Sequence, residues 1–273
     1  MAAHIELVVE VAVQQQKEIL MALLTAAGAT GMEEERNRLK VYFEQQDFDS
    51  TLCKNIIEQN SLKYSISVVE DKNWNADWEA GFQPVVIDDF CVIRAGFHEP
   101  RPAVQHDIII TPKMSFGTGH HATTHMMVKA MAGISFAGST VFDFGTGTGV
   151  LAILAEKLGA HKVTAIDNDA WSIANAEENF NSNNCSKVLL FSSESIPEDC
   201  LFDVILANIN RNIILQNLAA IKQHLAKDGV VLLSGLLSGD EPVIMEEAGK
   251  HYLKLNQRFE MSGWICLQLV SDK

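Results

Sequence analysis

The feature that most constrains the fold is a glycine-rich turn between an apolar strand and a helix. Residues 139–144 are apolar enough for a buried strand, and Gly145, Gly147 and Gly149 follow at alternate positions before a helical stretch at 150–158. A second β-rich segment ends in Asp167. Glycine permits positive φ and close backbone approach, and a helix N-terminus presents unbonded N–H groups. This order predicts a parallel α/β unit with a ligand site at the carboxyl ends of its strands.

The spacing of these residues indicates the kind of ligand. An acid that ends the second strand can accept both hydroxyls of a ribose, so Asp167 and the glycines predict an adenosine-binding site. The dinucleotide fingerprint is G-x-G-x-x-G, whereas here Gly149 comes one residue earlier. Asp143, at the first strand end, would repel pyrophosphate but suits a cationic ammonium group. The pattern D-x-G-x-G-x-G followed by Asp167 resembles the class I S-adenosylmethionine methyltransferases; a turn that merely connects strand to helix is the alternative.

Length and charge bound the remaining possibilities. The chain has 273 residues, 47% of them hydrophobic, which is enough for a large and a small domain with substantial cores. The formal net charge of −14 disfavours nonspecific binding to nucleic acid, whose phosphates such a surface repels. It favours a basic partner, although acidity that only maintains solubility explains the charge equally well.

The sequence carries no sign of export or membrane insertion. Glu6, Glu10 and Lys17 interrupt any apolar core of a signal peptide, and no uncharged apolar run approaches the roughly 20 residues that cross a bilayer. Five scattered cysteines form no C-x-x-C pair, and they are Cys53, Cys91, Cys185, Cys200 and Cys266. They predict reduced thiols in a cytoplasmic protein rather than disulfides or zinc ligands.

The first seventy residues have a pattern of their own. We expect strands at 4–11, 31–35, 39–44 and 63–69 and helices at 14–27 and 48–59. The order β-α-β-β-α-β predicts a small α+β ferredoxin-like domain over residues 1–70. It is either a recognition module or a purely structural addition. A linker helix with Trp74 and Trp78 is expected over residues 71–83.

Residues 84–273 are expected to form one domain. After a β-rich stretch at 84–110, strands are expected at 139–144, 162–167, 187–191, 202–207, 229–234, 252–260 and 264–270. Helices are expected at 150–158, 170–181, 213–225 and 241–249. This alternation predicts a doubly wound, mostly parallel, seven-stranded Rossmann-like sheet, and its last two strands predict a terminal antiparallel hairpin.

Three further segments are candidates for chemistry. The strand at 202–207 delivers Asn208 to the edge where Gly145 and Asp167 lie, and an amide oxygen there can accept from a substrate N–H. The alternative is that Asn208 only caps the following helix. Ser192-Ser193-Glu194 follows another strand, so that Glu194 either meets an adenine amino group or lies in a solvated turn.

The third segment, residues 115–125, is rich in Gly, Thr and His. It suits a loop over the cofactor, with Phe116, Gly117 and Thr118 among its contacts. His121 and His125 have the i, i+4 spacing of zinc ligands, but no carboxylate lies in the segment and no Glu follows His121, so we expect no metal site.

Several of these motifs together resemble one family, the bacterial ribosomal protein L11 methyltransferases (PrmA). The shared residues are Phe116-Gly-Thr-Gly119, His121, Thr123-Thr124, Asp143 to Gly149, Leu151-Ala-Ile153, Lys157 to Ala160, Ile166-Asp167 and Ala207-Asn-Ile209. The F-G-T-G-x-H-x-T-T segment is far more specific than the glycine motif. The resemblance is clear over residues 70–270, and it implies that Thr124, Gly145, Asp167 and Asn208 contact S-adenosylmethionine.

The implied reaction is transfer of a methyl group from S-adenosylmethionine to an amine of ribosomal protein L11, a lysine ε-amine or the N-terminal α-amine. Asn208 and Thr124 are expected to orient amine and cofactor, and the N-terminal unit to recognise this basic substrate without a requirement for nucleic acid. The alternatives are a methyltransferase of another protein or a small amine, a nicotinamide dehydrogenase that the glycine spacing disfavours, and a non-catalytic adenosine-binding assembly protein.

Overall fold

The computed structural model describes residues 4–69, 82–113 and 115–272. By its internal contacts the chain divides into two compact units, residues 1–81 and 82–273, and each has its own buried core. The linker helix expected over residues 71–83 lies largely outside the described residues.

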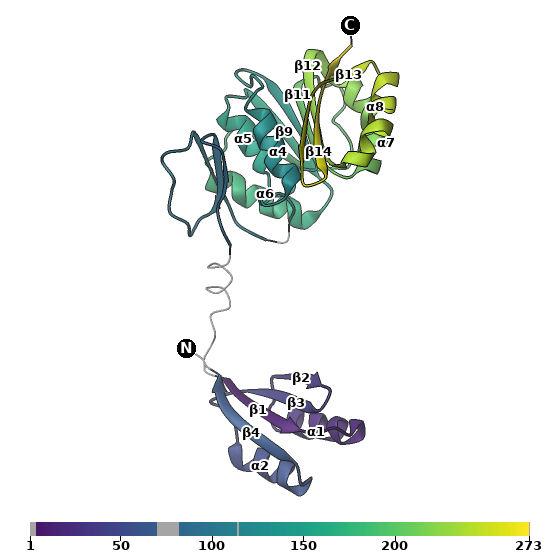
Figure 1. Ribbon diagram of the computed structural model, residues 1–273. Coiled ribbons are helices and arrows are strands. Elements are labelled where there is room, and N and C mark those ends of the chain that lie inside the picture. Colours follow the sequence, from purple (N-terminus) through teal and green to yellow (C-terminus); the bar gives the residue numbers. More distant parts are fainter. Residues whose placement is uncertain (1–3, 70–81, 114, 273) are drawn as a thin grey trace. The chain divides into compact units, whose positions relative to one another are not determined.

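The N-terminal unit is a four-stranded antiparallel sheet in the order β2-β3-β1-β4, with two helices (Figure 1). Its elements are β1 (His4–Glu10), α1 (Gln14–Ala26), β2 (Gly31–Glu35), β3 (Arg38–Glu44), α2 (Ser50–Gln59) and β4 (Lys63–Val69). Alternate strand residues such as Leu7 and Phe43 are fully buried with Leu20 and Ile57 of the helices. The ferredoxin-like order is therefore confirmed.

Helix α1 also buries a charged side chain. Lys17 is 3% exposed, and its ammonium donates to the carbonyl oxygens of Glu35 (2.6 Å) and Arg36 (3.2 Å). These carbonyls lie at the turn between β2 and β3, so the lysine ties the helix to this hairpin.

The larger unit contains a seven-stranded sheet in the order β10-β9-β8-β11-β12-β14-β13. Its strands are β8 (Thr140–Phe144), β9 (Lys162–Asp167), β10 (Val188–Ser192), β11 (Phe202–Asn208), β12 (Leu225–Leu237), β13 (Leu253–Met261) and β14 (Trp264–Ser271). The pairs from β10 to β12 are parallel, and β14 is antiparallel to both of its neighbours. The doubly wound, Rossmann-like sheet with a terminal hairpin is thus confirmed.

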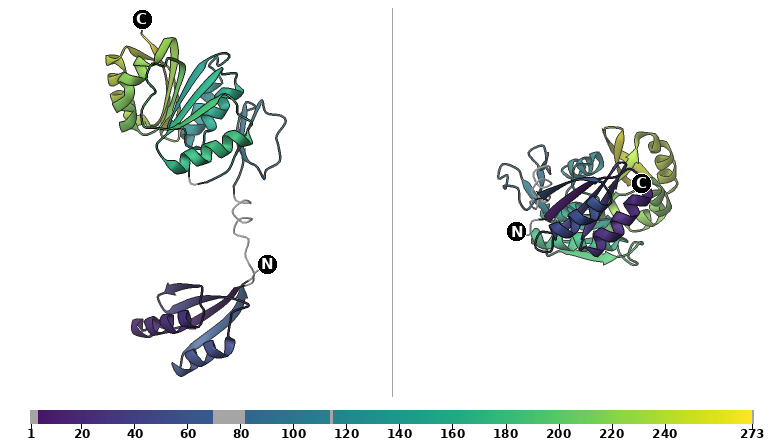
Figure 2. Two further views of the ribbon diagram at one scale, coloured as in Figure 1. Left: turned by 180° about the vertical axis from the view of Figure 1, so that it is seen from behind. Right: turned by 90° about the horizontal axis from the view of Figure 1, so that it is seen from below.

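Helices cover both faces of this sheet (Figures 1 and 2). They are α4 (Ala122–Met131), α5 (Val150–Lys157), α6 (Ala170–Ser182), α7 (Arg211–Gln223), the 3-10 turn η1 (Ser238–Asp240) and α8 (Glu241–Lys250). Residues of α4, α5 and α6 share one core cluster, and those of α7 and α8 share the other. Strand β8 contributes residues to both clusters, because Val141 belongs to the first and Phe142 to the second.

Two elements differ from the expectation. The segment at 115–125 is a loop only as far as His121, whose ring caps the start of α4, a helix absent from the sequence-based assignment. Strand β12 is also longer than residues 229–234, because it continues through an irregularity between Leu233 and Leu236. Gly235 lies there with φ +82°, and a Cβ on it would lie 2.1 Å from the carbonyl oxygen of Ile209.

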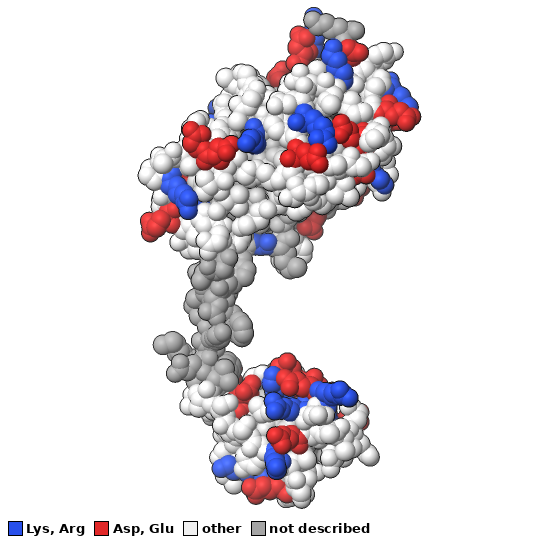
Figure 3. All heavy atoms as spheres, viewed as in Figure 1, with Lys and Arg blue, Asp and Glu red and all other residues white. Residues whose placement is uncertain are grey.

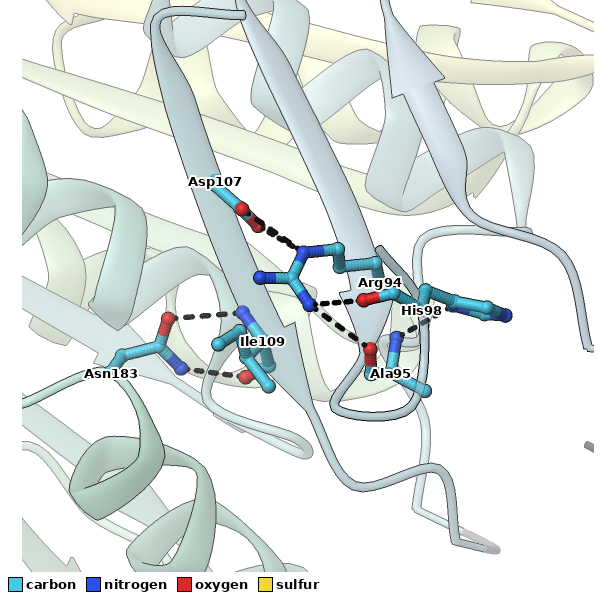
Figure 4. A network of polar contacts seen from close by, with 6 residues as sticks. All are labelled: Arg94, Ala95, His98, Asp107, Ile109 and Asn183. Carbon is cyan, nitrogen blue, oxygen red and sulfur yellow. Dashed lines mark hydrogen bonds and ion pairs between the residues drawn. The ribbon is translucent and has the colours of Figure 1, made fainter. Parts of the chain in front are cut away.

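The β-rich stretch at 84–110 forms a separate three-stranded sheet of β5 (Val85–Ile87), β6 (Cys91–Ala95) and β7 (His106–Ile110). Arg94 of β6 is 5% exposed, and its Nε donates to both carboxylate oxygens of Asp107 on β7, at 2.8 and 3.0 Å (Figure 4). Asn183, at the end of α6, bonds both the N–H and the carbonyl of Ile109. The ion pair thus joins two strands of the small sheet, and Asn183 attaches this sheet to α6.

Candidate active site

The glycine loop adopts the conformation for which its glycines were expected. Gly145, Gly147 and Gly149 have φ of +73°, +55° and +81°, which residues with a Cβ rarely adopt. The N–H groups of Gly145 and Thr146 both donate to the carbonyl of Ile166 at the end of β9, at 3.0 and 2.9 Å. The loop is therefore held against β9 before α5 begins.

Asp167 lies at the end of β9 in a fixed orientation. Its Oδ2 accepts from the N–H of Gly147 (2.9 Å) and its Oδ1 from the N–H of Asp169 (3.0 Å). Each carboxylate oxygen keeps lone-pair capacity for a further donor. The side chain lines the cleft, so it presents two acceptors to a ligand there.

Asp143 lies beneath the loop. Its side chain is 1% exposed, and its Oδ2 accepts from the Thr146 hydroxyl at 2.6 Å. Burial raises the pKa of this carboxyl to about 7, against the lowering effect of the Thr146 hydrogen bond. Its contacts are thus with the loop itself, and it is absent from the residues that line the described clefts.

The segment around Phe116 packs directly onto the glycine loop. The carbonyl of Phe116 accepts from the N–H of Thr148 (2.9 Å), and that of Gly117 accepts from the Thr148 hydroxyl (2.8 Å). A Cβ on Gly147 would lie 2.4 Å from the Phe116 carbonyl oxygen. The middle glycine therefore makes room for another part of the chain, a contact that the motif alone does not reveal.

Thr118 lies further along this segment, where its hydroxyl is 3.2 Å from Nδ1 of His120. The ring of His121 packs edge-on against Phe116 on one side and Trp264 on the other, with centroids 5.3 and 4.7 Å apart. His121 thus acts as a helix cap and an aromatic wall. Within the described ranges, no three His, Cys, Asp or Glu residues form a group that could hold a metal ion.

Asn208 and Thr124 come together although they are far apart in sequence. Thr124 lies fully buried in the first turn of α4, and its Oγ1 accepts a long hydrogen bond of 3.4 Å from Nδ2 of Asn208. The Oδ1 atom of Asn208 is buried and receives no hydrogen bond from the residues that the structure describes. Asn208 is one of the residues that line the cleft, so this unused acceptor lies at the wall of the cleft.

Of the residues expected to contact the cofactor, Phe116, Gly145, Gly147, Asp167 and Asn208 line one cleft of about 380 Å³. Gly117, Thr118, Thr124 and Gly149 are not among its described lining residues. A neighbouring hollow of about 270 Å³ contains Glu194 together with Gly145 and Asp167. Glu194 accepts from Nδ2 of Asn168 at 3.2 Å.

Sequence reasoning missed several cleft residues, namely Asn168, Ile209, Ile213, Gly235 and Trp264. Asn168 and Ile209 directly follow the predicted site residues Asp167 and Asn208, so sequence position alone could have predicted that they line the cleft. Trp264 and Gly235 come from β14 and the irregular part of β12, and only the sheet order brings them to the cleft.

All five cysteines are free thiols, and burial raises the pKa of Cys91 and Cys266 to about 12. Across the described residues, no helix is both long and apolar enough to span a bilayer.

Comparisons with known proteins agree with this geometry. The family model "Ribosomal protein L11 methyltransferase (PrmA)" matches residues 5–272. The ribosomal protein L11 methyltransferase of Porphyromonas gingivalis is 37% identical over 271 residues, covering 96% of this chain and 93% of the relative. That of Chlorobaculum tepidum is 39% identical over 252 residues, covering 88% and 86%. The crystal structure of ribosomal protein L11 methylase from Lactobacillus delbrueckii subsp. bulgaricus has a TM-score of 0.66 at 28% identity, covering 70% of this chain and 99% of that one.

The family match extends across both units, including the N-terminal one, and so reaches beyond residues 70–270, over which the motifs carry the resemblance. The chain therefore belongs to the ribosomal protein L11 methyltransferase family, and it is a protein methyltransferase that uses S-adenosylmethionine.

Proposed function

We propose that this enzyme methylates amine nitrogens of ribosomal protein L11, with S-adenosylmethionine bound in the cleft between the glycine loop and Asn208. One observation carries the proposal. The buried Oδ1 of Asn208 is an acceptor without a donor among the described residues, and Asn208 is one of the residues that line the same cleft as Asp167. A buried acceptor left unpaired is costly, so a ligand N–H is its natural partner.

The residues present fit the cofactor. Asp167, oriented by two backbone N–H groups, would accept from the ribose hydroxyls. Glu194 in the adjoining hollow would lie beside the adenine. Gly145, Gly147 and the Phe116–Thr118 segment would form the wall along the methionine part, with Thr124 and Asn208 at its end. Gly149 and Asp143 would act by shaping the loop.

When bound, S-adenosylmethionine supplies an electrophilic methyl group on a positively charged sulfur. The chain's own contribution is to align and dehydrate the acceptor amine. A free lysine titrates near ~10.4, and only its neutral form is nucleophilic. Apolar walls such as Ile209 and Trp264 would lower that pKa by desolvation. Asn208 Oδ1 would then accept one amine N–H and point the nitrogen lone pair at the methyl group, while water takes the released proton.

The relatives are named for ribosomal protein L11, which supports that protein as the substrate. The N-terminal unit would bind it. Residues 4–69 contain ten acidic and six basic side chains, an excess that favours a basic partner. On the face shown in Figure 3 the two signs are interspersed, so specific pairing rather than a uniform acidic patch would set the docking. A ribosomal substrate and five free thiols both support a cytoplasmic location.

The test is incubation of the enzyme with labelled S-adenosylmethionine and ribosomal protein L11 purified from cells that lack methylation of this protein. Mass spectrometry should show whole methyl groups added at lysine or N-terminal amines. Asn208→Ala should lower kcat/KM on the order of a hundredfold through lost alignment of the amine and the cofactor. Label that enters only other proteins or small amines would contradict the proposed substrate, and unchanged turnover by Asn208→Ala would contradict its role.

A further inference from the structure

The strongest unexplained feature outside the cofactor contacts is a row of asparagines on α6. Asn175, Asn179 and Asn183 recur at every fourth position, which places them on one helical face, and the first two are fully buried. All three bond the backbone at the free edge of β7. Nδ2 of Asn175 donates to the carbonyl of Thr111 (3.1 Å), and Oδ1 of Asn179 accepts from the N–H of Thr111 (2.7 Å). The side-chain amide of Asn183 bonds both the N–H and the carbonyl of Ile109 (Figure 4).

Asn179 differs from Asn183 in one respect. Its Nδ2 donates to the carbonyl oxygen of Thr148 (2.8 Å), the residue that precedes the last glycine of the loop. The amide group therefore joins the chain just after β7 to the glycine loop. Asn183 instead donates a second bond to the carbonyl of Asn179 in its own helix.

Thr148 links Asn179 to the segment around Phe116. It is fully buried, and besides the bond from Asn179 it donates its N–H to Phe116 and its hydroxyl to Gly117. Thr111 and Phe116 both belong to the stretch that leads from β7 into α4. The start and the middle of that stretch are thus fixed to one pair of residues, Asn179 and Thr148, which are bonded to each other.

We infer that Asn179 is a positioning residue for the methyl donor: it sets the place of the Phe116–Thr118 segment over the glycine loop without contacting the ligand. Without its amide, the carbonyl of the fully buried Thr148 loses its donor, and the N–H of the half-buried Thr111 loses its acceptor. The wall formed by Phe116 and Gly147 would then loosen. The inference rests on the proposed placement of the cofactor in this cleft.

Two alanine variants form a matched pair. Asn179→Ala and Asn183→Ala each remove one side-chain amide and its bonds to the backbone of Thr111 or Ile109, but only the first removes a bond to Thr148. We expect both to lower the melting temperature. Asn179→Ala alone should raise the Kd of S-adenosylhomocysteine about tenfold in calorimetry, whereas Asn183→Ala should stay within about twofold.

A second readout needs no ligand. In the free full-length protein, hydrogen exchange of the Thr148 amide, which is bonded to Phe116, should be faster in Asn179→Ala and unchanged in Asn183→Ala. Thr148→Val keeps the Asn179 contact but loses the hydroxyl to Gly117, so it should weaken binding as well, and Thr148→Ser should restore it. If Asn179→Ala does not fold, this pair tests the link from Thr148 to Gly117, and unchanged binding by Thr148→Val would overturn the inference.

Equal effects of the two asparagine variants on the Kd, or unchanged exchange at Thr148 in Asn179→Ala, would overturn the inference. A separate variant, Asp167→Ala, tests the cofactor placement itself. If Asp167→Ala binds S-adenosylhomocysteine like the wild type, the placement fails; if it weakens binding while Asn179→Ala does not, only the role of Asn179 fails.

Discussion

At the scale of single residues, Gly147 shows that one glycine can be required for two reasons at once. Its φ of +55° strains any other residue, and an added Cβ would lie 2.4 Å from the Phe116 carbonyl oxygen. Gly138 provides the matched control, since it has φ +75° but no atom within 4 Å of a Cβ. Gly138→Ala should cost only the conformational term of about 1–2 kcal/mol.

Gly147→Ala adds the clash to this term, so it should cost at least ~1 kcal/mol more and raise the Kd of S-adenosylhomocysteine more than about tenfold. Denaturant unfolding and calorimetry on both variants measure this difference. Equal losses of stability and unchanged binding would show that the contact with Phe116 is unimportant.

The pKa of Asp143 makes stability depend on pH in a defined direction. Burial raises this pKa from 3.8 to about 7, so between these values the native state holds a proton that the unfolded state has released. The contribution of this group to the free energy of unfolding is therefore full below pH 4 and is lost as pH rises through 7. Asp143→Asn removes the titration.

Relative to the wild type, Asp143→Asn should accordingly gain stability between pH 5 and pH 8, by about 1–2 kcal/mol after allowance for relaxation around the buried charge. Urea unfolding of both proteins at the two pH values tests this. Parallel pH profiles would mean that the carboxyl titrates near its ordinary pKa.

At the scale of elements, the contrast between α5 and α4 shows what local sequence can predict. Helix α5 begins at a glycine motif with a defined strand before it, so its position follows from a few adjacent residues. Helix α4 begins at His121, an unusual cap, and almost every residue from Thr123 to Met131 is buried. Burial on all sides removes the amphipathic period on which sequence assignment depends.

The three-stranded sheet contains an ion pair between Arg94 and Asp107 that no local sequence pattern predicts. Arg94 is 5% exposed and bonds both Asp107 and the carbonyl of His98 (2.8 Å). Arg94→Met should lower the free energy of unfolding by about 2–3 kcal/mol, less than for a fully buried pair, because the Asp107 side chain is 30% exposed.

The exposed ion pair of Lys129 with Asp88, at 3.2 Å, is the control, and Lys129→Met should cost less than about 1 kcal/mol. Denaturant unfolding of the two variants provides the comparison. A similar small effect of both changes would show that Arg94 does little beyond a surface ion pair.

At the scale of the whole molecule, the site could be predicted as far as its residues lie close in sequence or at strand ends. Gly145 and Asp167 follow from one strand–turn–helix–strand unit, and Asn208 from the rule that parallel strands end at one edge. Trp264 and the bond between Asn208 and Thr124 depend on β14 lying beside β12 and on α4 packing against the sheet. Such contacts between distant segments leave no local pattern in the chain.

Each of the two units has its own buried core, so the larger unit is expected to fold without the N-terminal one. Leu7, Leu20, Phe43 and Ile57 are fully buried inside the N-terminal unit, and all of the described residues that line the cleft lie beyond position 115. A chain of residues 82–273 should therefore fold and bind S-adenosylhomocysteine with a Kd within about twofold of the full-length protein.

If the N-terminal unit docks the substrate, this shortened chain should methylate ribosomal protein L11 at least ~100-fold more slowly, with the loss in kcat/KM. Calorimetry and the labelled-methyl assay measure the two quantities side by side. Wild-type turnover by the shortened chain would refute the docking role, whereas loss of cofactor binding would show that the first unit supports the cleft itself.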